Sequence, residues 1–316
     1  MEAKIDLQIP SPLERLEHPL LNEKGVTVHV KRDDVIHPEI SGNKWRKLYL
    51  NIEKYHDRKY DKLLTFGGAY SNHIAATAKV GKYLGIPTIG IIRGEELNKD
   101  SNDTLKRAHE AGMELIFVSR MEYRLRGEND YKNELRAAHG NVLIIDEGGA
   151  NFYGAFGCTE ILNEFSQLDY QGIYLAAGTG TTAAGLLLAG LEVPIFAVAA
   201  LKNGGFLEKS ISDLLVLCGI PQALMAEQLS PLSLLCDYHF GGYGKYTPEL
   251  LEFMREIYAI TGLKLDQVYT AKALYALFNA VRNDQWEHGS KLLFIHTGGL
   301  QGIRTVEHEL NYSLTS

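Results

Sequence analysis

The chain has 316 residues, of which 45% are hydrophobic and 22% charged, and its formal net charge at pH 7 is −7. Such a composition is typical of a globular protein with one large or two ordinary domains. The negative charge argues against a nucleic-acid binder, which normally presents a basic face.

Neither a metal site nor a membrane segment is indicated. Cys158, Cys218 and Cys236 are scattered, without the spacing of a zinc site or a disulfide framework. No basic-then-apolar leader opens the chain, and the longest apolar stretch is too short to span a bilayer. We therefore expect a cytoplasmic protein with no metal, no nucleic-acid partner and no membrane contact.

The first predicted helix carries three cations in its opening turn. An alternating, β-branched strand over 26–31 precedes it, and the helix runs from Asn43 to about Tyr55 with Lys44, Arg46 and Lys47 at its start. A helix N-terminus is already partly positive, so each cation there is disfavoured by about 0.3–1 kcal/mol. A neutral amine is the form that attacks a carbonyl to make a Schiff base. Lys44 is therefore a candidate nucleophile, although this stretch alone also suits a basic surface turn.

Two series of strands alternating with helices follow. In the first, strands are predicted at 62–66, 88–93, 114–119 and 141–146, with helices at 72–84, 102–111 and 121–138. After a glycine-rich connection, strands are predicted at 172–176, 194–201, 237–240 and 291–295, with helices at 182–191, 205–218, 248–261 and 271–282. This pattern predicts two open parallel sheets buried on both faces, in two α/β domains with a cleft between them. Ligands of such sheets bind beyond the carboxyl ends of the strands.

The turn after the predicted strand at 172–176 is rich in glycine and threonine. Gly178 and Gly180 permit tight turns, while Thr179, Thr181 and Thr182 add hydroxyls to the unpaired N–H groups of the next helix. Together they predict an anion cup of the size of a phosphate, with an ordinary threonine-capped turn as the alternative. The spacing fits neither a P-loop nor a dinucleotide-binding fingerprint, which disfavours a nicotinamide dehydrogenase.

A second turn, Ser71-Asn72-His73, could seat a carboxylate on the start of the helix at 72–84. Ser71 alone could simply be the N-cap, and a lone histidine is more often structural than catalytic. Thr297 ends the last strand and could hydrogen-bond a ring nitrogen, or merely cap a turn. Tyr269 is either a core aromatic with a satisfied hydroxyl or a polar group that faces the cleft.

A reactive lysine, a phosphate cup, a carboxylate seat and a ring-nitrogen partner are what a pyridoxal phosphate enzyme needs. The sequence also resembles the 1-aminocyclopropane-1-carboxylate deaminase / D-cysteine desulfhydrase family, within the tryptophan synthase β-like (fold type II) group of these enzymes. The motifs that carry the resemblance follow the family's order, at 11–13, 31–34, 42–48, 67–73, 147–151, 178–182, 268–272 and 296–299.

The resemblance implies a role for each motif. Lys44 would form the Schiff base and move protons at the substrate α-carbon, and Asn43 would lie near the cofactor's phenolic oxygen. The turn from Gly178 to Thr182 would hold the phosphate, and Thr297 would approach the pyridine nitrogen. The substrate side would be formed by Ser71, Asn72, His73, Tyr269 and Thr270, with Ser71 and Tyr269 as further candidates for catalysis. A homodimer is implied, with a large cofactor-binding domain (1–47 and 156–316) and a small α/β domain (48–155).

The substrate is less closely defined. Thr270 and His73 stand where deaminases of the family have glutamate and glutamine, which favours the desulfhydrase branch, yet Tyr70, Ala75 and Ala76 depart from typical desulfhydrases. We predict α,β-elimination from a small amino acid such as D-cysteine, giving pyruvate, ammonia and sulfide. Ring opening of aminocyclopropane carboxylate to 2-oxobutanoate and ammonia is the alternative. A non-catalytic binding protein for a small ligand is an alternative of another class.

Overall fold

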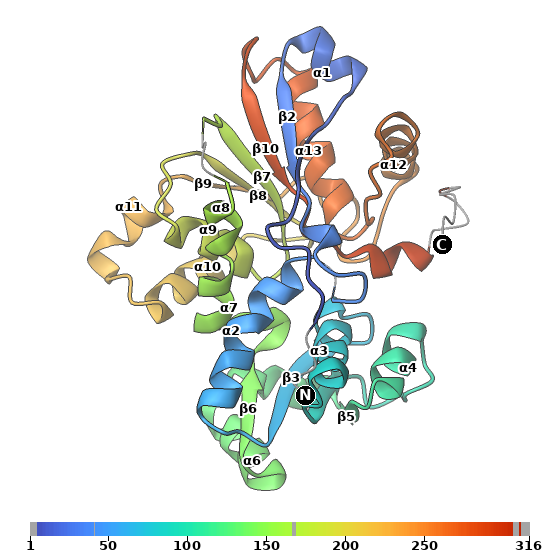
Figure 1. Ribbon diagram of the computed structural model, residues 1–316, viewed down its shortest axis with the longest axis vertical. Helices are drawn as coiled ribbons and strands as arrows, with labels where there is room; N and C mark the ends of the chain where they lie inside the picture. The colour runs from blue at the N-terminus through green and yellow to red at the C-terminus, as the bar shows by residue number, and fades with distance from the viewer. Residues whose placement is uncertain (1–4, 41, 166–168, 306–309, 311–316) are drawn as a thin grey trace.

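A computed structural model describes residues 5–40, 42–165, 169–305 and 310. It arranges them around two sheets, one at the top and one at the bottom of Figure 1. The larger sheet has six strands in the order β1-β2-β10-β7-β8-β9, and the smaller has four in the order β5-β4-β3-β6. The predicted α/β class with two open, largely parallel sheets is confirmed.

The six-stranded sheet is parallel except at one edge, where β1 runs antiparallel to β2. Its strands are β1 (Leu13–Arg15), β2 (Thr27–Lys31), β7 (Gly172–Ala177), β8 (Ile195–Ala199), β9 (Leu232–Leu235) and β10 (Lys291–Ile295). Alternate residues of β7 pack into two separate cores, Tyr174 into one and Ile173 and Leu175 into the other. Apolar side chains thus leave both faces of this sheet, and each face requires covering helices.

Helices cover both faces of the larger sheet. One core is closed by α1 (Pro19–Lys24), α12 (Pro248–Thr261) and α13 (Thr270–Arg282). The other is closed by α7 (Phe152–Gly157), α8 (Glu160–Asn163), α9 (Thr181–Leu188), α10 (Phe206–Leu217) and α11 (Met225–Leu229). Short 3-10 turns are η1 (Asp33–Val35), η2 (Leu125–Gly127), η3 (Glu147–Gly149), η4 (Gln222–Leu224) and η5 (Leu300–Thr305).

The four-stranded sheet is parallel throughout. Its strands are β3 (Lys62–Gly68), β4 (Thr88–Arg93), β5 (Glu114–Val118) and β6 (Val142–Ile145). One face is covered by α2 (Asn43–Asp57), α3 (Asn72–Leu84) and α4 (Asp103–Glu110), and the other by α5 (Arg120–Arg124) and α6 (Asn129–His139). The chain enters this unit through α2 and leaves it through α7, two helices that pack closely on each other.

Most predicted elements are confirmed, and α3, β4, α12 and β10 have the predicted bounds. The strand predicted at 237–240 is wrong, because Phe240 adopts a positive φ of 47° ahead of a glycine turn, and the edge strand β9 precedes it. The long helix predicted at 121–138 is broken at η2 into α5 and α6. The predicted domain boundaries fall within α2 and α7, and that division stays a prediction.

Two further features bear on function. Among the described residues, none of the helices combines the length and the apolar character needed to cross a membrane. The same part of the chain holds no group of three or more His, Cys, Asp or Glu side chains arranged to bind a metal ion.

The α2–α7 contact gives a testable prediction. A Cβ added at Gly157 would lie 1.9 Å from the carbonyl oxygen of Arg46, a backbone atom that cannot rotate away. Gly157→Ala should therefore lower the free energy of unfolding by about 1–3 kcal/mol, the usual cost of overpacking. Denaturant titration measures this loss.

A matched control is Gly205→Ala, at a position with a φ of −55° and open space around the added Cβ. That variant should keep wild-type stability. Equal stabilities of the two variants would contradict the close α2–α7 contact.

Candidate active site

The start of α2 is attached to the end of β10 by backbone contacts. The Asn43 N–H donates to the Thr297 carbonyl at 3.1 Å. Gly42 precedes it with a φ of 67°, and a Cβ there would lie 1.8 Å from the same oxygen. Only glycine fits this approach, since both the conformation and the space exclude a side chain. Lys44 is thereby held at the carboxyl end of the larger sheet, where ligands of such sheets bind.

A chain of hydrogen bonds joins Lys44 to the glycine-and-threonine turn. The Lys44 ammonium donates to Asn43 Oδ1 at 2.8 Å, and Asn43 Nδ2 donates to Thr182 Oγ1 at 2.7 Å. Asn43 and Thr182 are both buried. Three residues predicted separately from the sequence therefore meet in one network that joins α2 to α9.

The side chain of Lys44 loses its proton more easily than an ordinary lysine. Burial, followed by the positive charge of Lys47, lowers the pKa of Lys44 to about 7, although part of the residue stays accessible. Roughly half of such amines are neutral at neutral pH. The sequence predicted the effect of neighbouring cations, but the largest cause is burial, which depends on the tertiary structure.

Lys47 is a second buried cation of the site. Its exposed fraction is 5%, and burial lowers the pKa of its ammonium. No hydrogen-bond or ion-pair partner of this ammonium occurs among the described residues, and the backbone of Gly149 packs against its stem. A buried, unpaired charge is costly, so this position favours a bound anion. The sequence signal was its spacing of three residues from Lys44, which places both on one side of the helix.

The turn between β7 and α9 offers free backbone donors. Gly180, with a φ of 77°, is the N-cap of α9 and provides no side-chain hydrogen bond, so a threonine cap is not what forms here. Thr179 Oγ1 and Thr181 Oγ1 lie 2.8 Å apart. The first N–H groups of α9 and these hydroxyls form the kind of cup that binds phosphate.

Tyr269 packs on this cup from the start of α13. A Cβ at Gly178 would lie 2.9 Å from its ring, and the ring meets Tyr243 edge-on at 5.9 Å. Burial raises the pKa of Tyr269 well above its usual value, so the phenol stays neutral. Of the two alternatives weighed for this residue, the contact with the cup favours the polar group next to the site.

The Thr270 hydroxyl is engaged inside its own turn. It donates to Asp266 Oδ1 at 2.7 Å and accepts from the Asp266 N–H at 2.9 Å. The Asp266 carboxylate also accepts the backbone N–H groups of Val268, Tyr269 and Thr270. Thr270 is fully buried, so its direct role with substrate stays a prediction. Asp266, which sequence reasoning passed over, orders the turn that carries Tyr269.

Ser71 is the N-cap of α3, as one alternative had it. Its hydroxyl accepts the Ile74 N–H at 3.2 Å, which leaves the hydroxyl proton available to a ligand. Asn72 opens the helix beside it. The Ser71 side chain lies over Gly67, where a Cβ would approach it to 2.7 Å. No hydrogen bond joins these two side chains to Lys44 within the described ranges, and their role with a carboxylate stays a prediction.

His73 is a neutral imidazole with a defined tautomer. Thr65 Oγ1 donates to the Ile145 carbonyl at 2.8 Å, so it accepts from His73 Nε2–H at 3.0 Å. The remaining nitrogen, Nδ1, is a buried acceptor without a partner. Burial, with the charges of Lys44 and Lys47, lowers the pKa of His73 to about 3. An acceptor nitrogen does not donate to a carboxylate, so His73 suits a donor group of a ligand better.

Thr297 lies beside the same network at the end of β10. It is buried, its carbonyl holds the start of α2, and its hydroxyl has no hydrogen-bond partner in the part of the chain that the structure describes. The hydroxyl is therefore free to bond to a ligand group. Its role at a ring nitrogen stays a prediction.

Comparisons with known proteins point to one family. Residues 5–298 match the family described as pyridoxal-phosphate dependent enzyme. The chain is similar to the mitochondrial bifunctional D-cysteine desulfhydrase/1-aminocyclopropane-1-carboxylate deaminase of Arabidopsis thaliana, with 31% identity over 317 residues, 93% of this chain and 77% of that protein. A putative 1-aminocyclopropane-1-carboxylate deaminase of Pyrococcus horikoshii is 33% identical over 299 residues, 92% and 90% of the two chains.

A solved structure, described as an ACC deaminase homologue, has the same fold. It matches with a TM-score of 0.80 and 29% identity over 97% of this chain and 94% of that one.

The proximity of the two lysines gives a prediction about pH. Lys47→Met removes the neighbouring charge that disfavours protonated Lys44, so it should raise the pKa of Lys44 from about 7 by roughly one pH unit. The rate at which an amine-reactive reagent labels Lys44 in the ligand-free protein, followed against pH by mass spectrometry, measures this midpoint.

Lys54→Met is the matched control, because Lys54 lies on the same helix but packs over the ring of Tyr153, outside the site. Its midpoint should equal that of the wild type. A midpoint unchanged by Lys47→Met would contradict electrostatic coupling between the two amines.

Proposed function

Because the chain belongs to the family of pyridoxal-phosphate dependent enzymes, we propose that it catalyses α,β-elimination from a small amino acid most like D-cysteine. The products are pyruvate, ammonia and sulfide. The observation that carries this proposal is the Lys44 amine, with a pKa lowered to about 7 and a hydrogen-bonded link to a helix N-terminus suited to phosphate.

The residues present fit pyridoxal phosphate. Lys47 is a buried cation that lacks an anion, and the start of α9 lacks a side-chain cap, so both suit the phosphate. The free hydroxyl of Thr297 suits the pyridine nitrogen. When bound, the cofactor supplies an aldehyde carbon for attack by an amine and a ring that accepts electrons from the substrate α-carbon.

The chain itself binds the substrate and moves its protons. Lys44, neutral in about half of the molecules at neutral pH, takes the proton from the substrate α-carbon. The start of α3 offers backbone N–H groups, the Ser71 hydroxyl proton and the Asn72 amide to the substrate carboxylate. His73 offers an acceptor nitrogen to a donor group of the substrate.

The surroundings of Asp266 favour elimination over ring opening. Each oxygen of this carboxylate already accepts two hydrogen bonds from the turn at 268–270. Asp266 therefore has no acceptor left for a pyridinium proton, and Thr270 stands where deaminases of the family have glutamate. The Thr297 hydroxyl, unlike a carboxylate, would leave the ring nitrogen of a bound cofactor uncharged, and this would favour departure of a β-substituent over ring opening.

Ring opening of aminocyclopropane carboxylate is the second candidate. The Arabidopsis relative carries both activities in its name, so the two reactions are compatible with similar sequences. The homodimer belongs to the same proposal and rests on the resemblance, and the cytoplasmic location stays a prediction from the sequence.

A substrate panel tests the proposal. We expect pyruvate and sulfide from D-cysteine, with slower or no release of 2-oxobutanoate from aminocyclopropane carboxylate. Lys44→Ala should lower the rate by about 10²–10⁴-fold, the usual contribution of a side chain that transfers a proton. Lys54→Ala, on the same helix, should keep the wild-type rate.

The other outcomes separate the alternatives. Release of 2-oxobutanoate without pyruvate would establish the deaminase. Binding of amino acids without any turnover would favour a non-catalytic protein, and absence of D-cysteine turnover would defeat the desulfhydrase assignment.

A further inference from the structure

The first turn of α2 lacks the usual means of fixing a helix start. Its N-cap is Gly42, which makes no side-chain hydrogen bond, and no acidic residue lies in the turn. Instead the turn carries Lys44, Arg46 and Lys47, which the partial positive charge of the helix N-terminus disfavours. Something other than capping must hold the turn that presents Lys44.

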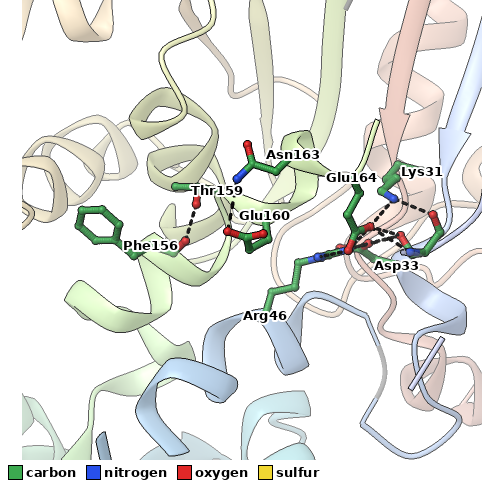
Figure 2. A network of polar contacts seen from close by, with 9 residues as sticks. Lys31, Asp33, Arg46, Phe156, Thr159, Glu160, Asn163 and Glu164 are labelled. Atoms are coloured by element: carbon green, nitrogen blue, oxygen red, sulfur yellow. Dashed lines mark hydrogen bonds and ion pairs between the residues drawn. The ribbon is translucent and has the colours of Figure 1, made fainter. Parts of the chain in front are cut away.

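A buried set of charges lies behind this turn, and we name it the Arg46 cluster: Ser11, Lys31, Asp33, Arg46 and Glu164. Figure 2 shows the Arg46 side chain reaching from α2 toward Asp33 and Glu164. Its guanidinium donates to both oxygens of Asp33, each at 2.7 Å, and to both oxygens of Glu164, each at 2.9 Å. Two bidentate contacts fix a planar group in position and in orientation.

The rest of the cluster completes the charge balance. Lys31 Nζ donates to Glu164 Oε2 at 2.5 Å and to the Ser11 carbonyl at 2.6 Å. The Ser11 hydroxyl donates to Asp33 Oδ1 at 2.7 Å, and the Ser11 N–H to Glu164 Oε2 at 2.9 Å. Two cations thus face two carboxylates, and the exposed fractions of their side chains are 8% or less.

The cluster acts on the opposite side of the turn from the site. Successive helix residues are about 100° apart, so Arg46 lies roughly 200° around the helix from Lys44, while Lys47 lies near Lys44. One face of the turn is therefore bound to the cluster, and the other presents Lys44 and Lys47, which have no carboxylate partner among the described residues. The backbone of Gly157 in α7 presses on the Arg46 carbonyl from a further direction.

The cluster also joins the two segments in which the chain crosses from one sheet to the other. Asp33 lies in η1, just before the chain enters α2, and Glu164 follows α8, just after the chain returns through α7. In Figure 1, α2 and α7 lie between the larger and the smaller sheet, and α8 lies beside the larger one. A loosened cluster would free the start of α2 relative to the larger sheet, whose strand β10 is followed by Thr297.

We propose that Arg46, Asp33 and Glu164 are positioning residues for Lys44. They hold the first turn of α2 from behind, in place of a cap, so that the Lys44 amine stays directed at the cup between β7 and α9. The placement of α2 is independent of the reaction, and only the kinetic part of the test rests on the proposed function.

Hydrogen exchange and kinetics of the holoenzyme test this proposal. Glu164→Gln keeps the shape but removes one carboxylate, and Arg46→Lys keeps the charge but not the bidentate geometry. In both variants, amides in peptides covering 43–50 should exchange at least about tenfold faster, because the turn opens locally. With D-cysteine, kcat should fall at least about tenfold while KM stays within about threefold, because the reacting amine and not substrate binding is misplaced.

The control variant is Tyr174→Phe, which removes the hydroxyl that accepts a hydrogen bond from Trp286 at 3.2 Å in the core of the same sheet. It should alter global stability without changing exchange at 43–50 or kcat. If Glu164→Gln fails to fold, Lys31→Met combined with Glu164→Gln restores charge balance and still removes the second carboxylate from Arg46.

Unchanged hydrogen exchange at 43–50 in folded cluster variants would overturn the proposal. An equally large increase of that exchange rate in Tyr174→Phe would overturn it as well. Because exchange needs no substrate, faster exchange in a protein that turns over no D-cysteine would leave the positioning role standing and reject only the proposed reaction.

Discussion

The contact on which the site depends is the backbone hydrogen bond from the Asn43 N–H to the Thr297 carbonyl. The absence of a side chain at Gly42 allows the two backbone segments to come this close. This hydrogen bond joins the start of α2 to the segment that follows β10, the last strand of the larger sheet. With that helix start in place, Asn43 reaches Thr182, and Lys44 reaches Asn43. A side chain at position 42 would displace the Thr297 carbonyl and separate the amine from the cup.

Paired and unpaired cations are separated on one helical turn. Arg46 is bound by two carboxylates, whereas the partly accessible Lys44 and the buried Lys47 have no carboxylate partner among the described residues. An unpaired buried ammonium destabilises the ligand-free fold, and part of that free energy is recovered when an anion binds. Burial, together with the positive charge of neighbouring lysines, keeps the Lys44 amine partly neutral and the His73 imidazole fully neutral. The electrostatics of the folded chain are thus suited to an anionic carbonyl ligand and a reactive amine.

Many of the strands and turns can be predicted from the local sequence. Runs such as 88–93 and 291–295 contain β-branched and apolar residues between turn signals, so all strands except the edge strands β1 and β9 were predictable, as was the placement of the glycine turns at their ends. The short edge strand β9 was missed because four residues give little periodicity. The alternating aromatic residues at 238 and 240 have a pattern typical of a strand, although they lie just before a glycine turn. Lys47 was visible in the sequence but was not recognised as a member of the site, although its spacing from Lys44 was available.

Other features depend on contacts between distant segments. The tautomer of His73 is set by Thr65 and by the carbonyl of Ile145, 80 residues further along the chain. The burial that lowers the pKa of Lys44 exists only once both units are assembled. The Arg46 cluster joins residues up to 153 positions apart, so no local pattern reveals it.

The central claim is that one amine, that of Lys44, carries the cofactor at the cup between β7 and α9. Reduction of the holoprotein with borohydride, followed by peptide mapping, measures this most directly. The account predicts a pyridoxyl group on Lys44 alone. A pyridoxyl group on Lys47, on Lys272 or on any other lysine would contradict it.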